Sequence, residues 1–69
     1  MSNPILYRIT VNPHVLAGKP TIRGLRLSVE HLLCALSSGQ TPDELMEEYP
    51  ELEPEDFQAI LAYAADRVA

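Results

Sequence analysis

The stretch that most constrains the fold covers residues 18–29, in the first half of the chain. It reads Gly-Lys-Pro-Thr-Ile-Arg-Gly-Leu-Arg-Leu-Ser-Val, with apolar and polar residues interleaved on both sides of Gly24. Interleaving of this kind is typical of short extended segments, and glycine readily adopts the positive φ that a tight turn between them requires. The stretch therefore predicts a β-hairpin that reverses at Arg23 and Gly24, with Arg23 at an exposed tip.

An extended segment and a helix start flank this hairpin. Residues 5–11 are rich in β-branched and aromatic types and predict a strand. Pro13 ends it, because proline has no amide hydrogen and restricts the residue before it. Ser28 is a candidate helix N-cap, since its hydroxyl can accept from the free amides that open a helix. We expect residues 1–28 to form a strand-and-hairpin arm.

Two helices are predicted after the arm. Apolar residues recur at helical spacing over residues 29–38, and Gly39 stands where a left-handed residue ends a helix. Thr41 and Glu44 form a capping box, so a second helix begins there. It ends before Pro50, which disfavours helical geometry in the preceding residue.

A third helix is predicted from Pro54 towards Arg67, with acidic residues in its first turn. Its expected core face consists of Phe57, Ile60, Leu61, Ala64 and Val68. Further apolar residues leave little polar surface elsewhere on this helix, and a helix that is apolar on more than one face is usually covered on more than one face. The residues expected to contact a second subunit or another protein are Ala59, Ala62 and Tyr63.

Taken together, these patterns predict one mainly α domain over residues 1–69. Residues 29–69 form a trihelical module resembling a helix-turn-helix, and residues 1–28 add a short N-terminal β-strand and a β-hairpin arm. A domain of this size buries a small core, which favours a homodimer.

Charge is unevenly distributed along the chain, which has a net charge of −5. Residues 1–34 hold four cations and one carboxylate, whereas residues 35–69 hold one cation and nine carboxylates. Such a protein repels nucleic acid on average, so only the N-terminal half can bind it. The single Cys34 excludes an internal disulfide and fits a reducing cytosol. With no bilayer-length apolar run and no signal-peptide pattern, we expect a soluble cytoplasmic protein without membrane contact.

The candidate binding residues are Lys19, Arg23 and Arg26, which lie within eight positions on the arm. They either aid solubility on a solvated surface or bind phosphate or carboxylate, which guanidinium groups match with a planar fork of donors. Direct reading of DNA by the third helix is disfavoured, because its first turn carries Glu55 and Asp56 and its only cation is Arg67.

Neither a metal site nor a catalytic site is predicted. Glu47 and Glu48 are adjacent on a helix and point about 100° apart, so they cannot converge on one ion. His31 and Cys34 share a helix face but lack further ligands. The chain has no glycine-rich phosphate loop and no nucleophile with a placed base, so we expect no cofactor and no enzyme activity.

The chain also resembles the domain-of-unknown-function 433 family over nearly its whole length. The residues that carry the resemblance are Asn12-Pro13, the stretch 18–29, Gly39, Thr41-Pro42-Asp43-Glu44, Tyr49-Pro50, Leu52, Pro54-Glu55-Asp56 and Ala62-Tyr63. Members of that family are similar to small bacterial helix-turn-helix-type proteins, and many resemble antitoxins encoded beside a toxin.

The resemblance implies an antitoxin-like protein that neutralises a PIN-like nuclease toxin and acts with it on their own promoter. An arginine of the arm would then enter the acidic metal-binding pocket of the nuclease. Two alternatives stay open: a DNA-binding regulator acting alone through the arms of both subunits, and a small dimeric interaction protein with no toxin partner.

Overall fold

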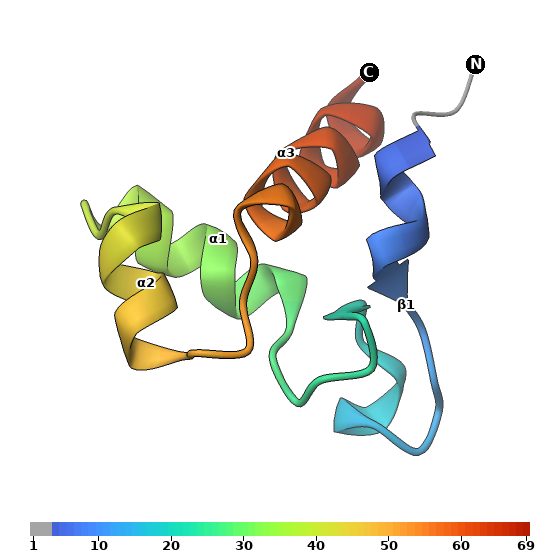
Figure 1. Ribbon diagram of the computed structural model, residues 1–69. Helices are drawn as coiled ribbons and strands as arrows, with labels where there is room; N and C mark the ends of the chain where they lie inside the picture. Colours follow the sequence, from blue (N-terminus) through green and yellow to red (C-terminus); the bar gives the residue numbers. More distant parts are fainter. Residues whose placement is uncertain (1–3) are drawn as a thin grey trace.

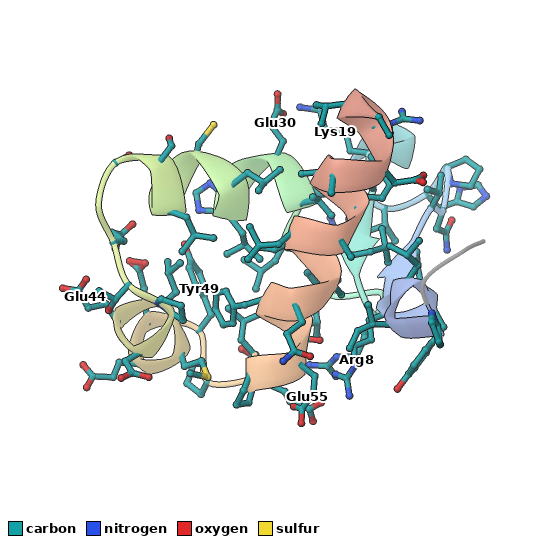
Figure 2. The ribbon with its side chains drawn as sticks, turned by 90° about the horizontal axis from the view of Figure 1, so that it is seen from above. Arg8, Lys19, Glu30, Glu44, Tyr49 and Glu55 are labelled. Carbon is teal, nitrogen blue, oxygen red and sulfur yellow. The ribbon has the colours of Figure 1, made fainter. Side chains whose placement is uncertain are left out.

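The computed structural model describes residues 4–69, and three helices dominate it (Figure 1). The long helix α3 lies between the N-terminal segment on one side and helices α1 and α2 on the other (Figures 1 and 2). The elements in chain order are the 3-10 helix η1 (Pro4–Arg8), strand β1 (Ile9–Thr10), the 3-10 turn η2 (Leu16–Gly18), strand β2 (Thr21–Ile22) and helices α1 (Val29–Ser37), α2 (Pro42–Glu48) and α3 (Pro54–Val68). The mainly helical architecture with a short antiparallel sheet confirms the sequence-based prediction.

The N-terminal strand is much shorter than predicted. Residues 5–11 were expected to be extended, yet Pro4–Arg8 form η1 and only Ile9–Thr10 form β1. The reason lies in the partner strand, because β1 pairs antiparallel with the two residues of β2 and a longer strand would have unpaired backbone groups. The 3-10 helix satisfies amides locally and packs beside α3 instead (Figure 1).

The predicted chain reversal occurs at Arg23 and Gly24. Gly24 has a φ of +73° and Arg23 one of +46°, the pair of positive values that a type I′ turn needs. The amide of Leu25 donates to the carbonyl of Ile22 at 2.7 Å and closes the turn. After the turn, Leu27 accepts from the amide of Ile22 at 3.1 Å, so a short hairpin-like ladder leads directly into α1.

Local signals set the ends of α1 and α2 as predicted. The hydroxyl of Ser28 accepts from the amide of His31 at 2.9 Å, and Gly39 follows α1 with a φ of +102°. Thr41 and Glu44 form the capping box at the start of α2. The helices enclose a core of Ile22, Val29, Leu32, Leu45, Leu52, Phe57 and Ile60.

The buried face of α3 differs from the prediction. Leu61 is 56% exposed and Val68 is 85% exposed, although both were expected in the core. Asp56 and Ala59 are buried instead, and the carboxylate of Asp56 binds Arg8 and Arg23 inside the fold. Ala59 is fully buried within the chain, so its predicted place in a partner interface is wrong.

Within the described residues, no helix is both long and apolar enough to cross a lipid bilayer.

Gly24→Val should destabilise the fold by about 1 kcal/mol or more, because valine tolerates positive φ poorly. A Cβ at this position would meet no atom within 4 Å, so backbone strain alone would cause the loss. Thermal unfolding of the variant measures it. Gly24→Asn is the matched control and should lose less, since asparagine adopts left-handed geometry more readily. An unchanged melting temperature for the valine variant would contradict the assigned turn.

Candidate functional site

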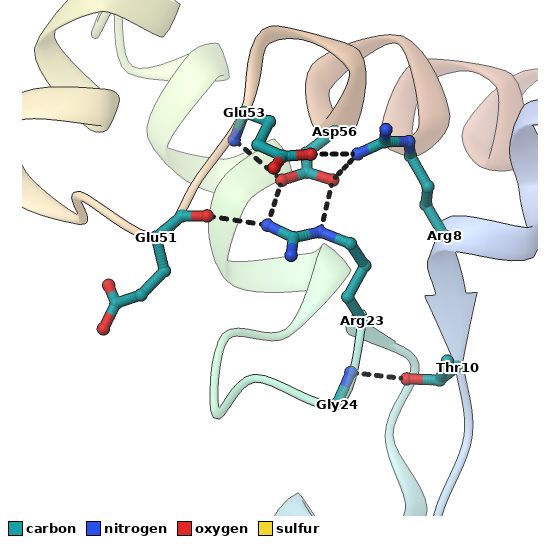
Figure 3. Close-up of polar contacts among 7 residues, drawn as sticks. All are labelled: Arg8, Thr10, Arg23, Gly24, Glu51, Glu53 and Asp56. Carbon is teal, nitrogen blue, oxygen red and sulfur yellow. Dashed lines mark hydrogen bonds and ion pairs between the residues drawn. The ribbon is translucent and has the colours of Figure 1, made fainter.

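The carboxylate of Asp56 is the centre of a polar cluster that joins three parts of the chain (Figure 3). Arg23 donates to it twice, from Nε to Oδ1 at 3.0 Å and from Nη2 to Oδ2 at 2.9 Å. Arg8 donates from Nη1 to Oδ1 at 3.0 Å, and the backbone amide of Glu53 donates to Oδ2 at 2.8 Å. The carboxylate therefore receives four donors while its side chain is only 1% exposed.

Arg8 and Arg23 each make one further contact that fixes the cluster to the segment before α3. Arg23 Nη2 donates to the carbonyl of Glu51 at 2.6 Å, and Arg8 Nη1 pairs with Glu53 Oε1 at 2.7 Å (Figure 3). Through these contacts the two guanidinium groups fix η1 and the turn after β2, at Arg23 and Gly24, to the N-terminal end of α3.

Opposing effects act on the ionisation of Asp56. Burial alone would raise the pKa of this carboxyl, but the hydrogen bonds from Arg23, from the Glu53 amide and from Arg8 outweigh burial and hold the pKa below its usual value. The hydrogen bonds between Arg23 and Asp56 raise the pKa of the Arg23 guanidinium. The cluster is a charged and paired structural element under neutral conditions.

Arg23 therefore does not lie at an exposed tip, and that expectation is wrong. Its side chain is 30% exposed and points from the turn towards α3. The sequence signal that could have predicted this contact is Asp56 at the third position of a helix whose N-cap is Glu53. An acid at that position accepts an N-cap amide and is available to a nearby cation.

Asp56→Asn should lower the free energy of unfolding by about 2 kcal/mol or more at neutral pH, since it leaves two arginines without their buried counter-charge. Because the folded-state pKa of Asp56 is lowered, its stabilisation is present above the unfolded pKa and lost as pH falls through the folded pKa. The difference in melting temperature between wild type and variant should therefore shrink below about pH 4.

Glu53→Gln is the control for that variant, because it removes only the exposed partner of Arg8 and should cost less than about 1 kcal/mol. A stability gap between wild type and Asp56→Asn that stays constant from neutral to acidic pH would contradict the assigned ion pairs.

Three cations remain outside the Asp56 cluster in the described residues: Lys19, Arg26 and Arg67. All three line two neighbouring surface grooves that share Lys19. Groove 1 has a volume of about 560 Å³ and is lined by Leu16, Lys19, Arg26, Leu27, Ser28, His31 and Tyr49. Groove 2 has a volume of about 470 Å³ and is lined by Lys19, Pro20, Val29, Glu30, Leu33, Cys34, Tyr63 and Arg67.

Groove 1 lies at the N-terminal end of α1, where the turn, α1 and the end of α2 meet. His31 Nε2 and the hydroxyl of Tyr49 are 3.1 Å apart and hydrogen bonded, and their rings meet edge to face. Arg26 is exposed and forms no ion pair or hydrogen bond with the described residues. The positive end of the α1 dipole adds to the charges of Lys19 and Arg26, so groove 1 favours an anionic group.

Groove 2 lies between α1 and α3. Arg67 extends over the ring of Tyr63, with 5.3 Å between its guanidinium carbon and the ring centroid. Lys19 Nζ pairs with Glu30 Oε1 at 3.1 Å, and Figure 2 shows the two side chains together on one side of the molecule. Glu30 is the one carboxylate that lines either groove.

Comparison with known proteins gives a family. Residues 9–64 match a family described as a protein of unknown function, DUF433. The chain belongs to the DUF433 family. The crystal structure of a DUF433 member from Anabaena variabilis is similar, with a TM-score of 0.81 and 32% identity. That similarity covers 86% of this chain and 58% of the Anabaena chain.

A second relative is the uncharacterized protein y4eO of Sinorhizobium fredii, with 29% identity over 56 residues. The match covers 81% of this chain and 25% of y4eO, so this chain spans about a quarter of that relative and just over half of the Anabaena protein. These similarities support the fold and the family.

The structure divides the candidate residues of this DUF433 protein. Lys19 and Arg26 share groove 1, whereas Arg23 belongs to the Asp56 cluster. Tyr63 lines groove 2. Its neighbour in the sequence, Ala62, is half-buried. His31, Tyr49 and Arg67 were not predicted as binding residues, because they lie in three separate helical regions of the chain.

The described residues also bear on metal binding. Within residues 4–69, no three histidine, cysteine, aspartate or glutamate side chains converge as potential metal ligands. The chemistry that the grooves offer is recognition of an anionic group by two or three cations beside apolar surface.

Proposed function

We propose that this DUF433 protein is a cytoplasmic, antitoxin-like binding module that neutralises a PIN-like nuclease. The observation that carries the proposal is the division of its cations. Arg8 and Arg23 bind Asp56, whereas Arg26 at groove 1 has no partner among the described residues and Lys19 forms only an exposed ion pair with Glu30. The family resemblance supplies the class of partner, and groove 1 supplies a surface suited to its carboxylates.

The proposed contact uses Arg26 where the sequence suggested either Arg23 or Arg26. A guanidinium without a partner in its own chain can donate two parallel hydrogen bonds to a carboxylate. Nuclease sites that hold metal ions are rich in carboxylates, so a cation entering one would compete with the metal. Lys19 would supply a second positive charge from across groove 1.

Arg26→Gln should lower affinity for the nuclease by about 2 kcal/mol or more if its guanidinium is buried at the contact, as interface hot spots are. Nuclease activity measured in the presence of this variant should return, and Lys19→Gln should restore part of it. Glu47→Gln, an exposed change on α2 outside both grooves, is the control and should leave neutralisation intact. Full neutralisation by the Arg26→Gln, Lys19→Gln double variant would overturn the proposal.

A DNA-binding regulator is the second candidate, favoured by the location of Lys19, Arg26 and Arg67 on neighbouring grooves. If these cations meet phosphates, each substitution should weaken binding to every sequence and flatten the salt slope by about one. A gel shift by the isolated protein that persists at physiological salt and depends on Arg26 would favour this candidate. Identifying the proteins that co-purify with the chain from its own host would separate both candidates from a toxin-free interaction protein.

A homodimer is proposed through the outer face of α3. Leu61 and Val68 are exposed there, and Ala62 is half-buried, so an apolar strip faces solvent along the helix. Light scattering at micromolar concentration should show a dimer, and Leu61→Glu should shift it towards monomer. If the wild-type protein is a monomer at about 100 μM, the proposed interface is wrong, since specific interfaces of ordinary size associate well below that concentration.

A further inference from the structure

Groove 2 has an apolar lining and a cation, Arg67, that the proposed contact at groove 1 does not use. We infer that groove 2 is a second binding site, for a segment of the partner protein that carries a large apolar side chain beside a carboxylate. The inference rests on the proposed protein-binding function and adds the chemistry of the segment and its place on the surface.

The apolar lining of groove 2 comes from two helices and the loop before β2. Pro20 precedes β2, Val29 and Leu33 lie on α1, and Tyr63 lies on α3. Leu33 and Tyr63 are half-buried, so part of each is still in contact with solvent and gains by being covered. A volume of about 470 Å³ holds a large apolar side chain together with the adjoining backbone.

The charges at groove 2 select the polar part of the ligand. Lys19 and Arg67 line it, and Glu30 opposes them from α1, which leaves an excess of one positive charge on a chain whose net charge is −5. Arg67 is already held over Tyr63, so its guanidinium loses little conformational freedom when a carboxylate binds. Charge complementarity therefore favours an acidic segment over a basic one.

Two other occupants fit less well. A second copy bound by the same groove would place Lys19 and Arg67 of both copies face to face, which costs electrostatic energy. A nucleic acid would bring phosphates near Glu30 and would need the face of Tyr63 for base stacking, where Arg67 already lies. A protein segment needs only one carboxylate and one apolar side chain.

Cys34 offers a direct readout, because it lines groove 2, is exposed and is the only cysteine of the chain. Its thiolate attacks one sulfur of an added disulfide, a mixed disulfide forms, and the other half of the reagent leaves as a thiolate. Intact mass spectrometry follows this reaction with two probes of opposite charge: 5,5′-dithiobis(2-nitrobenzoate), an aromatic dianion, and cystamine, an aliphatic dication.

Arg67→Gln should slow modification by the aromatic dianion about threefold or more at low salt, since about threefold is the effect of one unit charge on one carboxylate of the reagent about 7 Å away in water. The same variant should not slow the modification of Cys34 by cystamine. Arg26→Gln removes the same charge from groove 1 and should leave both rates unchanged. Raising the salt to about 1 M should abolish the effect of Arg67→Gln. Equal effects of the Arg67 and Arg26 variants would overturn the inference, because the rates would then report net charge alone.

A peptide experiment tests the segment itself. A capped tetrapeptide of two glutamates and two leucines should shift the amide NMR signals of Leu33, Cys34 and Tyr63 at millimolar concentration, while versions with glutamine for glutamate or alanine for leucine should bind at least about threefold more weakly. Shifts confined to Ser28, His31 and Tyr49 would overturn the assignment of groove 2 and leave the proposed function standing. The nuclease assay with Arg26→Gln tests that function separately.

Discussion

The buried ion pairs of Asp56 join three parts of the chain that lie far apart in the sequence. Arg8 and Arg23 lie 48 and 33 residues away from Asp56 in the sequence, and both bind the same carboxylate. A 69-residue chain buries a small core, and its sheet has two residues in each strand. The cluster compensates for that short sheet by fixing η1 and the β2 turn against α3. The apolar packing of Phe57 and Ile60 depends on the same helix orientation.

The cluster also determines which cations are available for binding. An arginine within reach of a buried carboxylate is held there, because separating the pair would leave an uncompensated charge inside the protein. Arg23 is therefore part of the fold even though it belongs to the same short segment as Arg26. They are only three positions apart in the sequence, yet one binds Asp56 and the other lines groove 1. The type I′ turn at Gly24 produces this division by reversing the chain between them.

Local chemistry predicted much of the fold, and tertiary contacts determined the rest. The Thr41 capping box, the Ser28 cap and the positive φ of Gly24 each depend on a few neighbouring residues, so the sequence was sufficient. The length of β1 depended on a partner strand in another segment. The buried face of α3 was ambiguous because apolar residues surround the helix, and it includes Asp56, whose partners Arg8 and Arg23 are distant in the sequence. For the candidate site, the sequence identified Lys19 and Arg26. It did not predict that His31, Tyr49 and Arg67 lie near them, because that depends on the packing of the helices.

The acidic body of the protein gives the grooves a selectivity that their cations alone would not have. Screening limits electrostatic effects to about 8 Å at physiological salt, so an anionic group inside a groove responds mainly to Lys19, Arg26 or Arg67. A long polyanion such as duplex DNA cannot be confined to a groove, and its flanking phosphates would approach the carboxylates of α2 and of the start of α3. A short acidic segment of a protein avoids that repulsion. The contrast between local positive charge and overall negative charge therefore supports the proposed protein partner over nucleic acid.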